Sequence, residues 1–396
     1  MTGWGKVRFL FSFTGGSGHF LPTEVFARAL VRRGHDVRYT CQELMVGTVA
    51  RAGWEVSPSG GRSLLGKDDR RPLAPADRDA EERAVRRFFA GRAARERAHR
   101  LLELFDVWRP DLVVRDEMDF GAAVAAEAAG LPHAAVVVIA AGGFTHEGII
   151  AEPLAALRSE LGLVPEGAVA ALDRYLLLVP VPPSFRDPRA PLPPTARHVR
   201  PAILEETALP PPGTGSDAER DAPHVYFTLG TVFPQESGDL FGRVLAGLTS
   251  LGARVTVTTG DAVSPAELGE QPSSVRAEHF LPLSEVLPGA DLVVSHGGSG
   301  TVVSALALGL PQVVLPMGAD QLGTAERCEQ LGVGAVLDAF SSTADDVANA
   351  VKTVLGTAHF GSSAKRLSDE ARALPGAEYA ASLLETVART GSPVQG

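Results

Sequence analysis

A glycine-rich turn between a buried strand and a buried helix is the feature that most constrains this chain. The apolar run at residues 291–295 predicts a strand covered on both faces, and the turn at residues 296–301 (HGGSGT) follows it directly. Residues 302–308 have the composition of a buried helix, which Gly309 ends. Such a turn leaves backbone N–H groups free at the positive end of a helix dipole, so it predicts a phosphate or diphosphate site.

A GGxG motif alone could be an ordinary tight turn with no ligand. The residues on either side of this motif favour a ligand-binding turn. Glycines let the backbone approach a ligand closely, and His296, Ser299 and Thr301 can add donors. Asp320 and Gln321 follow the next predicted strand and lie near the same sheet edge. The glycines of this turn are Gly297, Gly298 and Gly300.

The first residues of the chain repeat the strand, glycine turn and helix. Residues 7–13 predict a strand and residues 14–20 (TGGSGHF) a loop that includes Ser17 and His19. A helix is expected from Pro22, whose missing N–H costs nothing at a helix start. A second strand at residues 36–41 completes a βαβ unit, which implies a parallel sheet. A later strand ends at Asp116, with Glu117 and Asp119 close by.

The chain has 396 residues, which is longer than a single hydrophobic core usually serves, so two domains are expected. Residues 206–222 are rich in proline, glycine and acids and predict a linker. We therefore expect two doubly wound α/β domains at residues 1–205 and 223–396, with the last helix free to pack back on the first domain. Ligands of such sheets bind beyond the carboxyl ends of the strands, so the cleft between the domains is the expected site.

Residues 60–100 are charged and Arg-rich, first with proline and glycine and then with a helical pattern. The charge favours a solvated surface, although the position after the third strand also allows a flap over a site.

Charge and cysteine content exclude several classes of protein. The net charge of −10 argues against nucleic acid and against an anionic membrane as partners. Cys41 and Cys328 are too few for a disulfide framework or a zinc site, and we find no metal-ligand cluster. The longest apolar run, residues 134–141, is too short to span a bilayer and predicts a core strand at residues 133–141. No signal peptide is recognised. A reducing cytoplasm fits these features.

Taken together, the motifs resemble those of family 1 GT-B glycosyltransferases, especially the actinobacterial enzymes that modify macrolides, enediynes and aromatic polyketides. The most specific part is residues 280–321, which hold an aromatic-x-Pro, HGGxGT, Gly-Leu-Pro and Asp-Gln at the family's spacing. TLGT at residues 228–231 and GHFLP at residues 18–22 match in the expected places. The resemblance covers essentially the whole chain and implies two Rossmann-like domains that face each other across a cleft.

The resemblance implies a nucleotide-sugar site in the second domain. Phe280 would stack on the nucleobase and Leu281 would offer main-chain groups to its edge. His296 and the turn after it would bind the diphosphate, with Gly230 and Thr231 on the opposite side of the pocket and Ser17 nearby in the first domain. Asp320 and Gln321 would bond sugar hydroxyls.

One position departs from relatives that use UDP-sugars. They carry a Glu on the helix after the glycine turn that bonds both ribose hydroxyls, and this chain has Ser304 there. A short hydroxyl suits a ring with only the 3′-OH, so a dTDP-sugar donor is expected. The alternative is that Ser304 is a tolerated small residue and the donor is a UDP-sugar.

The resemblance also assigns His19 as the general base that deprotonates the acceptor hydroxyl. Its place before a helix N-terminus predicts a neutral ring, because the helix dipole disfavours an imidazolium. The family pairs this histidine with an Asp, and Asp116 matches best, although Glu117 or Asp119 could take the role. We expect displacement with inversion at the anomeric carbon and no metal.

The expected acceptor is a hydroxyl of a hydrophobic natural product, set by residues 60–100 and 142–150. The sugar, the aglycone, the choice among O-, N- and C-transfer, a homodimer and an auxiliary protein stay open. A non-catalytic glycosyltransferase-like partner and epimerisation of a sugar nucleotide are the competing interpretations. An NAD-dependent dehydrogenase is disfavoured because His19 stands where GxGxxG requires its third glycine.

Overall fold

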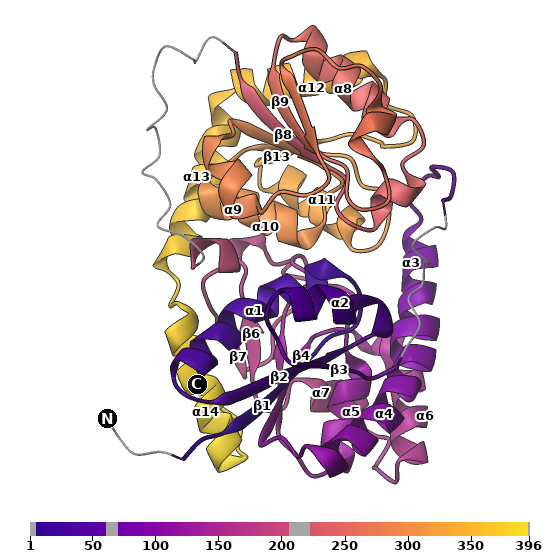
Figure 1. The fold of residues 1–396 in the computed structure, drawn as a ribbon, viewed down its shortest axis with the longest axis vertical. Coiled ribbons are helices and arrows are strands. Elements are labelled where there is room, and N and C mark those ends of the chain that lie inside the picture. Colours follow the sequence, from indigo (N-terminus) through magenta and orange to yellow (C-terminus); the bar gives the residue numbers. More distant parts are fainter. Residues whose placement is uncertain (1–4, 61–69, 206–221, 395–396) are drawn as a thin grey trace.

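The computed structural model describes residues 5–60, 70–205 and 222–394 of the chain. The predicted linker, apart from Ala222, and residues 61–69 of the charged segment lie outside these ranges. Two α/β units stack along the long axis of the molecule, the first lower and the second upper in Figure 1. Within the described residues, no helix combines the length and the apolar character needed to cross a membrane.

The first unit is built on a parallel sheet of seven strands among the described residues. In spatial order these are β3 (Val56–Pro58), β2 (Asp36–Cys41), β1 (Arg8–Ser12), β4 (Leu112–Asp116), β5 (His133–Val136), β6 (Leu177–Val179) and β7 (Ala196–His198). Its helices are α1 (Ser17–Arg32), α2 (Glu43–Arg51), α3 (Arg78–Ala84), the π-helix η1 (Val85–Ala93), α4 (Ala94–Val107), α5 (Phe120–Ala128), α6 (Glu147–Glu160), α7 (Ala168–Leu172) and the short η2 (Pro183–Phe185) and η3 (Ala202–Leu204).

The second unit repeats the plan with a parallel sheet of six described strands. In spatial order these are β10 (Val275–Glu278), β9 (Arg254–Thr258), β8 (His224–Thr228), β11 (Leu292–Ser295), β12 (Gln312–Val314) and β13 (Gly334–Val336). Its helices are η5 (Phe233–Glu236), α8 (Leu240–Ser250), η6 (Pro265–Leu268), α9 (Leu283–Val286), η7 (Leu287–Gly289), α10 (Ser299–Leu308), α11 (Gln321–Gln330), α12 (Ala344–Gly356), α13 (Ala358–Ala373) and α14 (Ala377–Thr390). The predicted fold class of two doubly wound sheets is confirmed.

Register at the switch point of each sheet decides which residues meet. Ser12 at the end of β1 pairs with Arg115 of β4, so the loop after β1 meets Asp116. Thr228 at the end of β8 pairs with Ser295 of β11, so the loop after β8 meets His296. Both crevices lie outside the carboxyl ends of the strands, where doubly wound sheets bind ligands.

Side chains alternate across the first sheet and fill two cores, as the period of two in a strand requires. Phe9 and Phe11 of β1 pack into one apolar cluster, whereas Leu10 between them packs into the cluster on the other face. A further buried cluster joins the two units, with Val137 and Val179 from the first and Val302 and others from the second. The units therefore share an apolar interface.

Two predicted boundaries are wrong. Helix α1 begins at Ser17 and holds Pro22 inside it, so His19 lies in the first helical turn and not in a loop. A proline inside a helix crowds the carbonyl of the residue four positions earlier. Here that residue is Gly18, which has no side chain to increase the crowding, so the helix can accommodate Pro22. The strand predicted at residues 133–141 ends at Val136, because the N–H groups of Val138 and Ile139 bond the Glu117 side chain and not a neighbouring strand.

The last helix, α14, crosses back to the first unit and packs on α1, as the yellow segment of Figure 1 shows. Leu384 and Val387 join the first apolar core. Glu385 accepts two hydrogen bonds from the Arg33 guanidinium, at 2.7 and 2.8 Å, and lies 2.6 Å from Nε2 of His35. The hydrogen bond from Arg33 is the main reason that the pKa of Glu385 falls to about 2.

We predict that Glu385→Ala lowers the free energy of unfolding by about 2–3 kcal/mol, because charged hydrogen bonds to a half-buried cluster are lost. The folded-state pKa is below the unfolded value of roughly 4.3, so this stability exists above that pH and is lost as pH falls towards about 2. Denaturant unfolding at pH 7 and pH 3 measures both effects.

Glu378→Ala is the matched control, since Glu378 pairs with Arg32 and Arg33 at an exposed position and should change stability by less than about 1 kcal/mol. Equal losses for both variants would contradict a special role for Glu385.

Candidate active site

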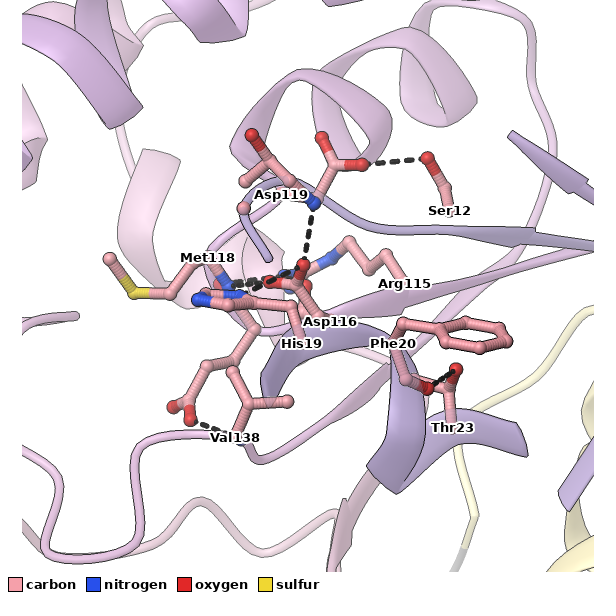
Figure 2. Close-up of polar contacts among 12 residues, drawn as sticks. Ser12, His19, Phe20, Thr23, Arg115, Asp116, Met118, Asp119 and Val138 are labelled. Carbon is pink, nitrogen blue, oxygen red and sulfur yellow. Dashed lines mark hydrogen bonds and ion pairs between the residues drawn. The ribbon is translucent and has the colours of Figure 1, made fainter. Parts of the chain in front are cut away.

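His19 and Asp116 lie side by side at the switch point of the first sheet, as Figure 2 shows. Nδ1 of His19 is 3.3 Å from Oδ2 of Asp116, which is longer than a usual charge-assisted hydrogen bond. Asp116 is fully buried and accepts the backbone N–H groups of Thr14 at 2.7 Å and of Met118 at 2.6 Å. Two backbone bonds thus fix the carboxylate, and the carboxylate in turn faces the imidazole.

The electrostatics of His19 differ from the sequence-based expectation. Burial alone lowers the pKa of His19, but the nearby charge of Asp116, with smaller contributions from Asp320 and Glu117, leaves the pKa raised. The expected effect of the helix dipole is therefore outweighed by carboxylates. Asp116 therefore favours the protonated form of the His19 ring, contrary to the neutral ring expected from the helix dipole.

The two other acids near Asp116 have different partners. Asp119 forms a buried pair with Arg97, with bonds of 2.9 and 2.6 Å, and accepts from Ser12. Glu117 accepts the N–H groups of Val138 and Ile139 at 2.7 and 2.6 Å. Of the three acids considered as the partner of His19, Asp116 is therefore the one that contacts it, whereas Glu117 and Asp119 are bound elsewhere.

In the second domain the His296 ring is wedged between two glycines. A β-carbon on Gly230 would lie 2.7 Å from the ring, and one on Gly298 would lie 2.5 Å from Nε2. Gly230 also has a positive φ of 76°, which favours glycine. Burial lowers the pKa of His296 to about 4, so the ring is neutral and can offer one N–H to a ligand.

Helix α10 begins beyond His296 and directs its first N–H groups into the cleft. Gly300 is exposed and Thr301 is half-buried, so this turn is open to a ligand. The side chain of Ser299 is not free, contrary to the expectation that it donates to phosphate. Its Oγ accepts the N–H of Ala140 at 2.7 Å and donates to Asp320.

The remaining predicted donor-site residues line the same region. Phe280 is 58% exposed, which rules out a core role and leaves its face open for stacking. Leu281 and Ser304 are half-buried, and Ser304 follows Thr301 by three residues and so shares its side of α10. Ser17 is the first residue of α1, and Thr231 is exposed after β8.

Asp320 and Gln321 follow β12 but differ in availability. Burial raises the pKa of Asp320, although the Ser299 hydroxyl opposes the shift. Gln321 is buried, and its Oε1 accepts the N–H groups of Met317 at 2.7 Å and Gly318 at 3.1 Å. The oxygen of Gln321 therefore holds the turn, and only its amide nitrogen remains for a sugar.

The two halves of the site face each other. His19 and Asp320 are close enough for each charge to affect the other's pKa. A β-carbon on Gly16 would lie 3.4 Å from Val232 and 4.0 Å from the hydroxyl of Thr231. His19 of the first domain and the turns after β8 and β12 of the second domain therefore lie close together where the two domains meet.

Sequence reasoning missed the pair of Arg97 with Asp119 and the bond from Ala140 to Ser299. Arg97 belongs to residues 60–100, whose charge predicts a solvated surface, yet its side chain is buried. The one signal for burial is that Arg97 precedes the apolar Leu101 by four residues, which puts both on the same face of a helix. Nothing in the local pattern indicates the partner of Ser299, because that partner belongs to the other domain.

Comparison with known proteins agrees with this geometry. Residues 242–386 match the family model described as erythromycin biosynthesis protein CIII-like, C-terminal domain. The chain is 28% identical to 4′-demethylrebeccamycin synthase of Lentzea aerocolonigenes, over 96% of this chain and 99% of that protein. It is 31% identical to the elloramycin glycosyltransferase of Streptomyces olivaceus, over 70% of this chain and 69% of that protein.

Among solved structures, the spinosyn rhamnosyltransferase superposes with a TM-score of 0.78 at 25% identity, over 96% of this chain and all of that one. The two-domain plan, the facing switch points and these similarities lead to one conclusion. The chain belongs to the GT-B glycosyltransferases of actinobacterial antibiotic biosynthesis.

Proposed function

We propose that the protein transfers a deoxysugar from a dTDP-sugar to a hydroxyl of a hydrophobic natural-product aglycone, with inversion at the anomeric carbon. The observation that supports this most is the placement of the His19–Asp116 pair opposite Asp320 and the turn at the start of α10. A base on one side of a cleft and an anion site on the other are the two groups that a direct displacement requires.

In the proposed mechanism, Nε2 of His19 takes the proton of the acceptor hydroxyl as its oxygen attacks the anomeric carbon. Asp116 holds the ring through Nδ1 and stabilises the imidazolium that forms. The bond to the diphosphate breaks, and the leaving group gains negative charge at the first turn of α10 beside the neutral His296. Backbone N–H groups and hydroxyls stabilise that charge, so the proposal needs no metal.

Ser304 supports the choice of a dTDP-sugar. Its short side chain lies on the same side of α10 as Thr301 and offers one hydroxyl. The ribose of a UDP-sugar has both a 2′-OH and a 3′-OH, and a carboxylate would bind it better because it can accept hydrogen bonds from both. A UDP-sugar is the alternative donor, and a non-catalytic binding role is disfavoured by the intact pair of His19 and Asp116.

We predict that His19→Ala lowers kcat by 10²–10⁴-fold, the usual contribution of a general base, with dTDP affinity changed less than about twofold. Single-turnover assays with calorimetry on the same samples check both values. Unchanged turnover would contradict the base assignment.

Asp116→Asn serves as the matched test of the pair. The carboxylate opposes the effect of burial and raises the pKa of His19, so its loss should lower that pKa. Since the base must be neutral, the acid limb of kcat/KM should move to lower pH while the maximal rate falls. Circular dichroism must show that the fold is retained, because Asp116 also binds two backbone N–H groups.

We predict that Ser304→Glu changes the ratio of dTDP to UDP affinity by about tenfold in favour of UDP, the effect of one charged hydrogen bond to the 2′-OH that only UDP carries. Calorimetry with dTDP and UDP measures the ratio. Ser304→Gln has nearly the same size without the charge and should change the ratio less. An identical ratio in wild type and Ser304→Glu would remove the basis for a dTDP donor.

A further inference from the structure

A segment of the first domain, residues 70–84, lies on the second domain, and we call it the flap. The Arg70 guanidinium donates to both carboxylate oxygens of Glu267, at 2.8 and 3.0 Å. The Arg71 N–H donates to the carbonyl of Gln235 at 3.0 Å. Leu73 packs on the apolar core of the second domain, and Arg78 pairs with Glu326. Helix α3, at the right of Figure 1, carries the end of the flap.

Glu81 is the flap residue that reaches the proposed sugar side of the cleft. Its Oε1 lies 2.7 Å from the place that a β-carbon on Gly318 would occupy. Burial raises the pKa of Glu81, and the nearby backbone N–H of Ala319 opposes that rise. Only a glycine at position 318 leaves room for this approach, since any larger residue would collide with the carboxylate.

The turn that Glu81 contacts is strained and leads directly to Asp320. Among the described residues, Ala319 is the single non-glycine residue with a positive φ, at 51°. Such a conformation persists only where neighbouring groups fix it. Gln321 accepts the N–H groups of Met317 and Gly318, and the Glu81 carboxylate lies against Gly318 and close to the next N–H. Side chains from two different domains thus contact this turn.

We propose that Glu81 is a positioning residue for the donor sugar, which fixes the Ala319 turn and so directs Asp320 at the sugar hydroxyls. This inference rests on the proposed role of Asp320 in sugar binding. Glu81 contacts Gly318 and lies close to Ala319, whereas the contacts of His296 are with other residues. Through Glu81, the first domain would therefore affect recognition of the sugar more than recognition of the nucleotide.

The first test measures the turn itself, without any ligand. Hydrogen exchange of peptides covering residues 315–323 is compared in wild type, Glu81→Ala, Glu81→Gln and Glu82→Ala. Glu82 is the adjacent acid on α3 and has no ion pair among the described residues, so it is the matched control. Exchange at Ala319 should be at least tenfold faster in Glu81→Ala and close to wild type in the other two, because Gln keeps an acceptor oxygen.

The second test separates sugar from nucleotide by calorimetry with dTDP and with dTDP-glucose. Glu81→Ala should weaken dTDP-glucose at least fivefold and dTDP less than twofold, and Glu81→Gln should restore most of the loss. Equal weakening of both ligands, or equal effects of Glu81→Ala and Glu82→Ala, would overturn the positioning role.

A failure of the proposed donor class gives a different result from a failure of this inference. If wild type prefers UDP, the same variants are compared with UDP and UDP-glucose, since the prediction concerns the difference that the sugar makes. If wild type binds neither nucleotide, the proposed function fails, and unchanged exchange at Ala319 in Glu81→Ala would still overturn the contact that the inference requires.

Discussion

The hydroxyl of Ser299 joins the two domains at the cleft, and the rest of the site depends on that link. Its oxygen accepts the N–H of Ala140 from the first domain and donates to Asp320 of the second. A buried hydrogen bond contributes about 1 kcal/mol, but leaving either partner unpaired costs about 1–3 kcal/mol. Separating the domains breaks the bond from Ala140, whereas the bond from Ser299 to Asp320 lies within the second domain and is kept. The joined arrangement is therefore favoured by this one bond, at about 1 kcal/mol.

The apolar cluster behind Ser299 explains why the link forms where it does. Val137 and Val179 from the first domain pack with Val302 and Leu306 of α10 from the second, so the two domains share buried apolar surface here. Because both sheets direct their carboxyl ends to this interface, the residues that follow β1, β4, β8 and β11 converge there. The proposed base and the proposed anion site then face each other, and neither domain contains both.

Much of this arrangement could be predicted from the sequence because it depends on local patterns. Apolar runs followed by glycine turns predict most of the strands and the residues that follow them, including His19, Asp116 and His296. Contacts that depend on the other domain could not be predicted. From its place in the sequence, the Ser299 hydroxyl was expected to donate a hydrogen bond to phosphate. Only the folded structure shows that this hydroxyl already accepts the N–H of Ala140.

The properties of His19 show a second limit. The helix start was expected after it, and a neutral ring was expected from the dipole, but α1 begins at Ser17 and nearby carboxylates raise the pKa of His19. Burial and charge depend on the packed structure and leave no local signal in the sequence. Likewise, Glu81 belongs to a segment whose charge suggests a solvated surface, yet it contacts the turn before Asp320.

A crystal structure of the protein with dTDP bound tests the central claim most directly, namely that the two domains form one site with the nucleotide at α10 and the base opposite. The account predicts the diphosphate at the first turn of α10, within hydrogen-bond distance of His296, the nucleobase on Phe280, and Nε2 of His19 facing the open side of the β-phosphate. A diphosphate bound away from α10, or a His19 ring turned away from it, would contradict the account.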